Sequence, residues 1–188
     1  MSYYFSIVGT QDNPLFEYEF GTSKQSGDGQ AHFAEQARHL NQFVIHSSLD
    51  VVEEVQWGNG QMYLKCIDKF FNNYVSCFIT GSNAKFLLLH QPTASANSYT
   101  PGVGGAGGPM MSGSSTAASA TAAASSRAST SIGANPTSAA TEEAIKNFFN
   151  EVYENWVKTA MSPFYKANME IRSPLFRAKV AAAGKKYL

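Results

Sequence analysis

The sequence predicts an α+β protein in which a five-stranded antiparallel sheet lies between one helix on one face and two helices on the other. Short apolar runs bounded by turn residues indicate the strands, and longer segments with apolar residues at helical spacing indicate the helices. The expected order of strands and helices is β-β-α-β-β-β-α-α. A sheet covered on both faces is the economical arrangement for these elements.

Five segments have the composition of strands. In residues 15–20 three aromatic side chains alternate with two glutamates, as in a strand with one buried face. Turn residues stand at 9–14, at Asn72-Asn73 and at Gly81-Ser82-Asn83. The expected strands are residues 3–8, 15–20, 62–70, 74–80 and 84–90.

The C-terminal part predicts two helices joined by a turn that contains a proline. The first has one apolar face, formed by residues 145, 148, 149, 152, 153, 156 and 160. Thr141 is a suitable N-cap for it, and Glu142 and Glu143 favour the positive end of its dipole. The second is expected to begin at Ser173-Pro174, with serine as N-cap and proline in the first helical position. Because the apolar face carries no nucleophile or metal ligand, it is predicted to pack.

A further helix is predicted from Phe33 to Gln56, and it is apolar on an unusually wide arc. The helical wheel assigns its main apolar face to Leu40, Phe43, Val44, Val51 and Val55. Ile45, Leu49 and Val52 widen that face beyond the ~100° stripe of a surface helix, and Asp50 lies at the edge of the remaining polar strip. Either the C-terminal helices or the loop 21–32 cover the extra apolar residues, or a partner protein does. The candidate partner-binding residues are therefore Ile45, Leu49, Asp50 and Val52.

Residues 92–139 differ in composition from the rest of the chain. They are mostly Ala, Ser, Thr and Gly, and Arg127 is the only charged residue among them. Such a segment buries too little apolar surface to offset the entropy of ordering it, so it is predicted to be a disordered insertion within a single domain of residues 1–188. It contains the pattern Gly102-x-Gly104-x-x-Gly107, but without the adjoining strand and helix of a dinucleotide site. No cofactor is therefore expected.

Charge and spacing argue against several other functions. The formal net charge of zero does not favour a nucleic-acid partner. His32, His39 and His46 recur every seven residues, too far apart on a helix to bind one metal ion. Cys66 and Cys77 are expected on neighbouring rungs of one sheet face, as free thiols in a core. No apolar run approaches the ~18 residues of a membrane span, and no signal peptide is expected. The sequence predicts a cytoplasmic protein that is not an enzyme and binds no metal.

Short stretches along the chain resemble a known family. They are Ile7-Val8-Gly9, Asp12-Asn13-Pro14, Phe16-Glu17, residues 39–43, Leu49-Asp50, residues 62–65, residues 145–149, Val152-Tyr153, Pro163-Phe164-Tyr165, Ile171-Arg172-Ser173 and Gly184-Lys185-Lys186. In this order and spacing they resemble the sedlin family, subunit 2 of the transport protein particle (TRAPP) vesicle-tethering complex, which has the longin fold. The insertion departs from the shorter animal form of the family.

The resemblance implies a non-catalytic adaptor that joins core TRAPP subunits to peripheral ones. The assembly it implies is a guanine-nucleotide exchange factor for Rab/Ypt GTPases in ER-to-Golgi and Golgi transport. Expected partners are other TRAPP subunits and, indirectly, a Rab/Ypt GTPase. Association with ER and cis-Golgi membranes is expected only through the complex. Asp50 matches the Leu-Asp of the family's first helix and is expected to face a peripheral subunit.

One alternative is a small-ligand-binding module of profilin-like or PAS-like shape. That function would need an internal cavity with converging polar groups.

Overall fold

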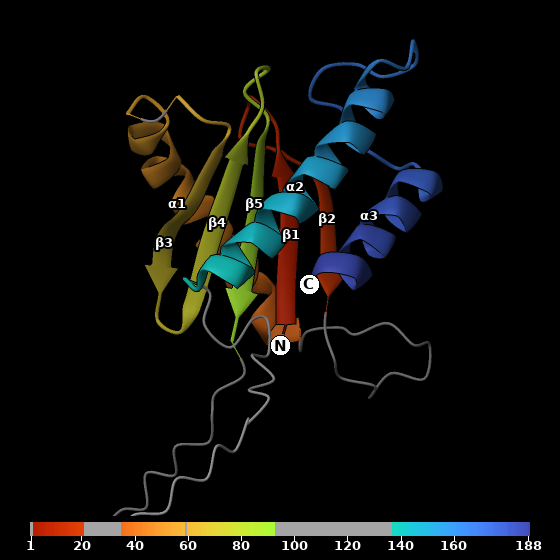
Figure 1. Ribbon diagram of the computed structural model, residues 1–188. Coiled ribbons are helices and arrows are strands. Elements are labelled where there is room, and N and C mark those ends of the chain that lie inside the picture. Colours follow the sequence, from red (N-terminus) through yellow and green to blue (C-terminus); the bar gives the residue numbers. More distant parts are fainter. Residues whose placement is uncertain (1, 21–34, 59, 93–136) are drawn as a thin grey trace, which may run out of the picture. The chain divides into compact units, whose positions relative to one another are not determined.

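Five antiparallel strands form one sheet in the order β2-β1-β5-β4-β3 (Figure 1). The computed structural model describes residues 2–20, 35–58, 60–92 and 137–188. Its elements are β1 (Ser2–Val8), β2 (Pro14–Phe20), α1 (Glu35–Val55), β3 (Tyr63–Phe70), β4 (Asn73–Ile79), β5 (Lys85–Gln91), α2 (Ala139–Ala160) and α3 (Pro174–Tyr187). The predicted element order is confirmed.

Each face of the sheet has its own hydrophobic core, because successive residues of a strand point to opposite faces. Along β5, Phe86 and Leu88 join the cluster under α2 and α3, whereas Leu87 and Leu89 join the cluster under α1. Figure 1 shows α2 and α3 on one face of the sheet and α1 on the other. The predicted arrangement, one helix against two, is confirmed and is that of a longin-like α+β fold.

Aromatic rings fill the core under α2. Phe5 lies in the middle of this core, with its ring edge-on to Phe86 at 6.1 Å and to Phe148 at 5.3 Å between centroids. The face of α2 predicted from periodicity is confirmed: Ile145, Phe148, Phe149, Val152 and Trp156 are buried, and Tyr153 and Ala160 are partly buried against the same cluster. Ring pairs in these orientations add about 0.5–1.5 kcal/mol each to the burial of their surface.

Hydrogen bonds tie the connection between α2 and α3 to the opposite end of the chain. Asn168 Oδ1 accepts a hydrogen bond from the backbone N–H of Thr10 at 3.0 Å, and Asn13 Nδ2 donates to the Asn168 carbonyl at 3.0 Å. The Ile171 N–H donates to the Leu15 carbonyl on β2 at 2.8 Å. These contacts hold the connection in place along the edge of β2.

Helix α3 approaches β2 most closely at Gly184. A Cβ atom at this position would overlap the ring of Phe20. That ring is packed between Tyr18, at 4.7 Å, and Phe148, at 5.7 Å between centroids. Glycine at 184 therefore lets the helix backbone rest directly on an aromatic ring.

The ends of the C-terminal helices were predicted with mixed success. Ser173 caps α3 as expected, its side chain accepting from the Phe176 N–H, with Pro174 in the first turn. For α2 the prediction was wrong: the N-cap is Ser138, whose Oγ accepts from the Thr141 N–H at 3.3 Å. Serine and threonine are both suitable N-cap residues. Thr141, however, is buried inside the first turn of α2, where the side chain of Ser138 reaches the Thr141 backbone N–H.

The two cysteines are free, but they do not share a face of the sheet. Cys66 pairs with Ser76, and Cys77 pairs with Lys65, so they stand on neighbouring rungs as predicted. Ser76 and Cys77 are consecutive on β4 and point to opposite faces. The register of β3 shifts between Tyr63 and Lys65, which moves Cys66 to the face opposite Cys77.

Some predictions fall on residues 21–34 or 93–136, which lie outside the described part of the chain. They include the loop at 21–32, His32, the glycine pattern at 102–107 and nearly all of the proposed insertion.

Candidate protein-binding surface on α1

The sheet, rather than a partner or the C-terminal helices, covers the extra apolar residues of α1. Ile45 is 4% exposed, Leu49 5% and Val52 0%, and all three belong to the cluster under α1. The prediction that these three side chains contribute directly to a partner surface is therefore corrected. They hold α1 on the sheet.

Two small polar residues explain why the helical wheel misplaced this face. Asn41 and Ser48 are fully buried, at spacings that continue the row of Val44, Ile45 and Val52. Ser48 Oγ donates to the Val44 carbonyl at 2.8 Å and lies 3.1 Å from Asp68 Oδ2. A helical wheel places polar residues on the exposed side of a helix. The predicted buried face of α1 was therefore rotated away from Asn41 and Ser48.

The rotation brings apolar side chains onto the outer side of α1. Leu40 and Phe43, assigned to the buried face by the sequence, are 46% and 60% exposed. Asp50 is also exposed, two helical turns after Phe43 and on the same side of the helix. It makes no ion pair with another described residue, whereas Glu53 lies 3.9 Å from Lys85. A carboxylate that no described basic residue neutralises, on the same side of the helix as exposed apolar groups, is suited to a basic partner group.

The turn between β3 and β4 extends this surface with two aromatic rings. Phe43 packs edge-on to Phe70, with centroids 6.5 Å apart, and Phe70 packs edge-on to Phe71 at 4.8 Å. Phe71 is 83% exposed and adopts φ 52°, a strained conformation for a bulky residue. Strain and exposure together are more typical of binding sites than of turns chosen for stability. We call Leu40, Phe43, Asp50, Phe70 and Phe71 the outer surface of α1.

Of these residues, sequence reasoning proposed only Asp50 for binding, and it assigned Leu40 and Phe43 to the buried face. The signal that it missed was the pair Phe70-Phe71 directly before the turn residues Asn72-Asn73, since two aromatic residues at a hairpin tip cannot both face the core.

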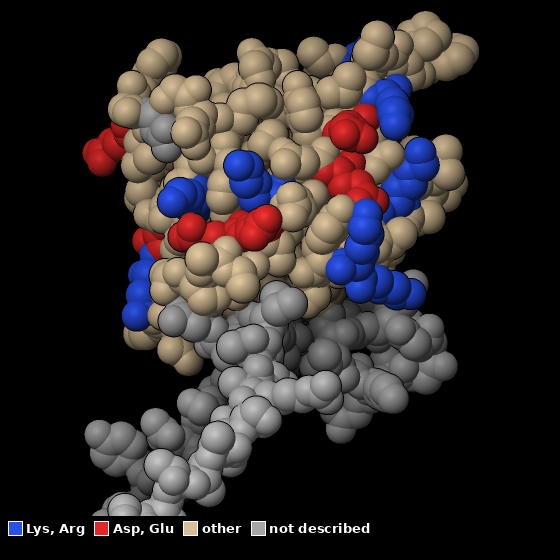
Figure 2. All heavy atoms as spheres, viewed as in Figure 1, with Lys and Arg blue, Asp and Glu red and all other residues tan. Residues whose placement is uncertain are grey.

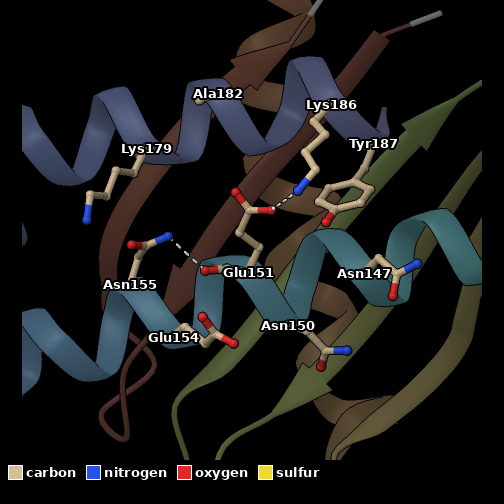
Figure 3. A pocket seen from close by; sticks show the side chains of 9 residues that line it. All are labelled: Asn147, Asn150, Glu151, Glu154, Asn155, Lys179, Ala182, Lys186 and Tyr187. Carbon is tan, nitrogen blue, oxygen red and sulfur yellow. Dashed lines mark hydrogen bonds and ion pairs between the residues drawn. The ribbon is translucent and has the colours of Figure 1, made fainter.

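A polar cleft of about 500 Å³ lies between α2 and α3. Figure 3 shows side chains of both helices facing it, with Lys186 reaching Glu151. Lys186 Nζ lies 3.0 Å from Glu151 Oε2, and this hydrogen bond lowers the pKa of the Glu151 carboxyl. Asn155 Nδ2 donates to the Glu151 carbonyl at 2.8 Å. The Lys186–Glu151 pair thus links α3 to α2 across the cleft, whose other charged lining residues are Glu154 and Lys179.

Histidines and acids do not converge in the described residues. His39 and His46 are exposed on α1, while His90 is buried on β5 and stacks on Tyr3 at 4.6 Å between centroids. Among residues 2–20, 35–58, 60–92 and 137–188, no three His, Cys, Asp or Glu side chains are placed to hold a metal ion. None of the helices described there is long and apolar enough to cross a membrane.

Comparison with known proteins matches the fold and the motifs described above. A family model described as sedlin matches residues 7–186. This chain belongs to the sedlin family. It is 34% identical over 188 residues to the transport protein particle 20 kDa subunit of Schizosaccharomyces pombe, covering 100% of both chains.

This chain also aligns with nearly the full length of two further relatives. The chain is 33% identical over 187 residues to the probable trafficking protein particle complex subunit 2 of Drosophila melanogaster, covering 97% of that protein. It is 28% identical over 217 residues to the trafficking protein particle complex subunit 20 of Saccharomyces cerevisiae, covering 99% of it. The resemblance read from short motifs is thus confirmed by similarity along the whole chain.

Proposed function

We propose that this protein is a non-catalytic adaptor in the TRAPP vesicle-tethering complex, joining core subunits to a peripheral subunit through the outer surface of α1. Full-length similarity to subunits of the particle supports membership. The observation that carries the adaptor role is the exposed carboxylate of Asp50, which has no ion pair among the described residues and lies on the same side of α1 as the exposed ring of Phe43.

The assembly in this proposal promotes nucleotide exchange on Rab/Ypt GTPases in ER-to-Golgi and Golgi transport. The chain contacts the GTPase only indirectly. It is cytoplasmic and reaches ER and cis-Golgi membranes through the complex.

The surface would bind through a desolvated aromatic group next to a charge. A partner that covers both Phe43 and Asp50 removes water from around the carboxylate, and a basic group opposite it then compensates for its lost hydration. Removing one member of such a desolvated pair costs about 2–5 kcal/mol of binding free energy. Ile45, Leu49 and Val52 act indirectly here, because their packing fixes which side of α1 faces outward.

Charge reversal at Asp50 tests this proposal. Asp50→Lys should leave the melting temperature unchanged, because the side chain is exposed and makes no ion pair with another described residue. The tagged variant, purified from the protein's own cells, should retain the core subunits and lose a peripheral one. Glu154→Lys is the matched control, an exposed glutamate on α2 on the other side of the sheet. Recovery of every subunit with Asp50→Lys would refute the assignment of this surface.

A further inference from the structure

A second apolar surface lies at the connection between α2 and α3, residues 161–173. Met161 is 79% exposed, Phe164 87% and Met169 42%. Leu175, in the first turn of α3, is 66% exposed. Four large apolar side chains are therefore exposed within fifteen residues. Exposed apolar patches of this kind mark interaction sites, because they lower the solubility of a protein that does not use them for binding.

Part of this surface is a pocket. It has a volume of about 590 Å³ and is lined by the end of α2 and by the connection, including Phe164, Tyr165, Met169, Ile171 and Arg172. This volume is within the ~300–1,000 Å³ range of ligand pockets. Ile171 is buried and belongs to the core cluster, so the pocket has a fixed apolar contact with the body of the protein.

The pocket is held in shape before anything binds. Ile171 is hydrogen-bonded to β2, and Asn168 is hydrogen-bonded to Thr10 and Asn13. A Cβ atom at Gly9 would meet Asn168 Oδ1, so glycine there allows the turn and the connection to approach closely. A site that is already ordered loses little conformational entropy when it binds.

The charge near this pocket is opposite to that of the α1 surface. Between residues 158 and 173 the charged residues are Lys158, Lys166, Glu170 and Arg172, three basic against one acidic. Glu170 is paired with Arg172 at 2.8 Å. Between Leu40 and Trp57 of the α1 segment, by contrast, the charged residues are Asp50, Glu53 and Glu54. In Figure 2 an uncharged surface lies near the end of α2, and the Lys and Arg side chains beside it alternate with Asp and Glu side chains.

We propose that this pocket is a second protein-docking site, which takes a bulky apolar side chain from an acidic segment of another TRAPP subunit. The concave shape favours a single inserted side chain over a lipid surface, and the surplus of basic groups favours an acidic segment around it. The inference rests on the proposed adaptor function and deepens it. One face of the sheet would carry an acidic docking surface and the other a basic one, so the two surfaces select different subunits.

Crosslinking and co-purification test the proposal with the full chain in its own cells. A photo-reactive phenylalanine at position 164 should crosslink to an acidic segment of one TRAPP subunit. Phe164→Ser and Arg172→Glu should each lower recovery of that subunit, on the order of tenfold or more, without changing the melting temperature, because both side chains are mainly exposed. Asp50→Lys should lower recovery of a different subunit. The matched controls are Trp57→Ser, at an 84% exposed aromatic residue, and Lys146→Glu, at an exposed lysine of α2.

Several outcomes would overturn the inference. One is unchanged recovery of every subunit with Phe164→Ser and Arg172→Glu. Another is loss of the same subunit from the pocket variants and from Asp50→Lys. A crosslink to lipid, or flotation with phosphatidylcholine–phosphatidylserine vesicles that Phe164→Ser abolishes while all subunits are retained, would assign the site to a membrane instead. If the unaltered chain recovers no TRAPP subunit, the proposed function itself fails.

Discussion

Replacing Gly184 with alanine measures how closely α3 is packed on the sheet. In an exposed helix position this change stabilises a protein by about 1 kcal/mol, because alanine is the better helix former. Here the added Cβ would lie only 2.7 Å from Cζ of Phe20, and nearer still to two other carbons of that ring. The ring is confined by Tyr18 and Phe148, so the helix must move.

The two effects oppose each other, and we expect packing to decide the sign. Overpacking a filled core costs about 1–3 kcal/mol. After the gain in helix propensity of about 1 kcal/mol is subtracted, Gly184→Ala should lower the free energy of unfolding by up to roughly 2 kcal/mol. For a unit of this size, a loss of about 2 kcal/mol corresponds to a fall of about 4–8 °C in melting temperature.

A double-mutant cycle separates the two effects. In a Phe20→Ala background the ring is gone, and Gly184→Ala should now stabilise the protein by up to about 1 kcal/mol. Ala182→Gly is the control for propensity alone, since Ala182 is exposed on the same helix, and it should cost about 1 kcal/mol. The unfolding of all variants is followed by circular dichroism in urea. If Gly184→Ala stabilises the protein in both backgrounds, the close approach of α3 to Phe20 does not exist.

Three further predictions concern other parts of the molecule. Replacing residues 93–136 with a short Gly/Ser linker keeps the Ser138 cap and should change the stability of the protein little. The reason is that each doubling of the length of a flexible loop costs only ~0.6 kcal/mol of closure entropy. Loss of the cooperative thermal transition would show that the segment packs. Burial raises the pKa of both thiols, and Cys77 is fully buried, so mass spectrometry after iodoacetamide treatment of the native protein should find Cys66 alkylated well before Cys77. The Lys186 hydrogen bond lowers the pKa of Glu151, so its contribution to stability is present above the ordinary glutamate pKa and is lost as pH falls through the lower pKa of the folded state. That contribution is small because solvent screens the pair, and a Lys186→Met variant should show a correspondingly weaker loss of stability in acid; an identical pH profile would contradict the assignment.

Local pattern was enough to predict the order of the elements. Alternation in residues 15–20 and the helical spacing in α2 report which side of each element is apolar, and the core under α2 accepts those sides unchanged. Ser173-Pro174 fixes the start of α3 by interactions confined to one turn. The family could also be read from the sequence, because its short motifs occur in order along most of the chain.

Tertiary structure alone decided the orientation of α1. Asn41 and Ser48 are polar, and only contact with the sheet shows that small polar side chains can lie in the buried row while Leu40 and Phe43 stay in water. Contact with the sheet also shows that Ile45, Leu49 and Val52 belong to the core and not to the binding surface, whereas Asp50 is exposed.

The pocket and the close approach of α3 also depend on contacts between residues far apart in the chain. Asn168 is 158 residues from Thr10, and Gly184 rests on Phe20. Periodicity describes one element at a time and contains no information about which element lies opposite. The sequence by itself therefore determined the elements and the family, whereas the folded structure decided which side chains were left in water to meet another protein.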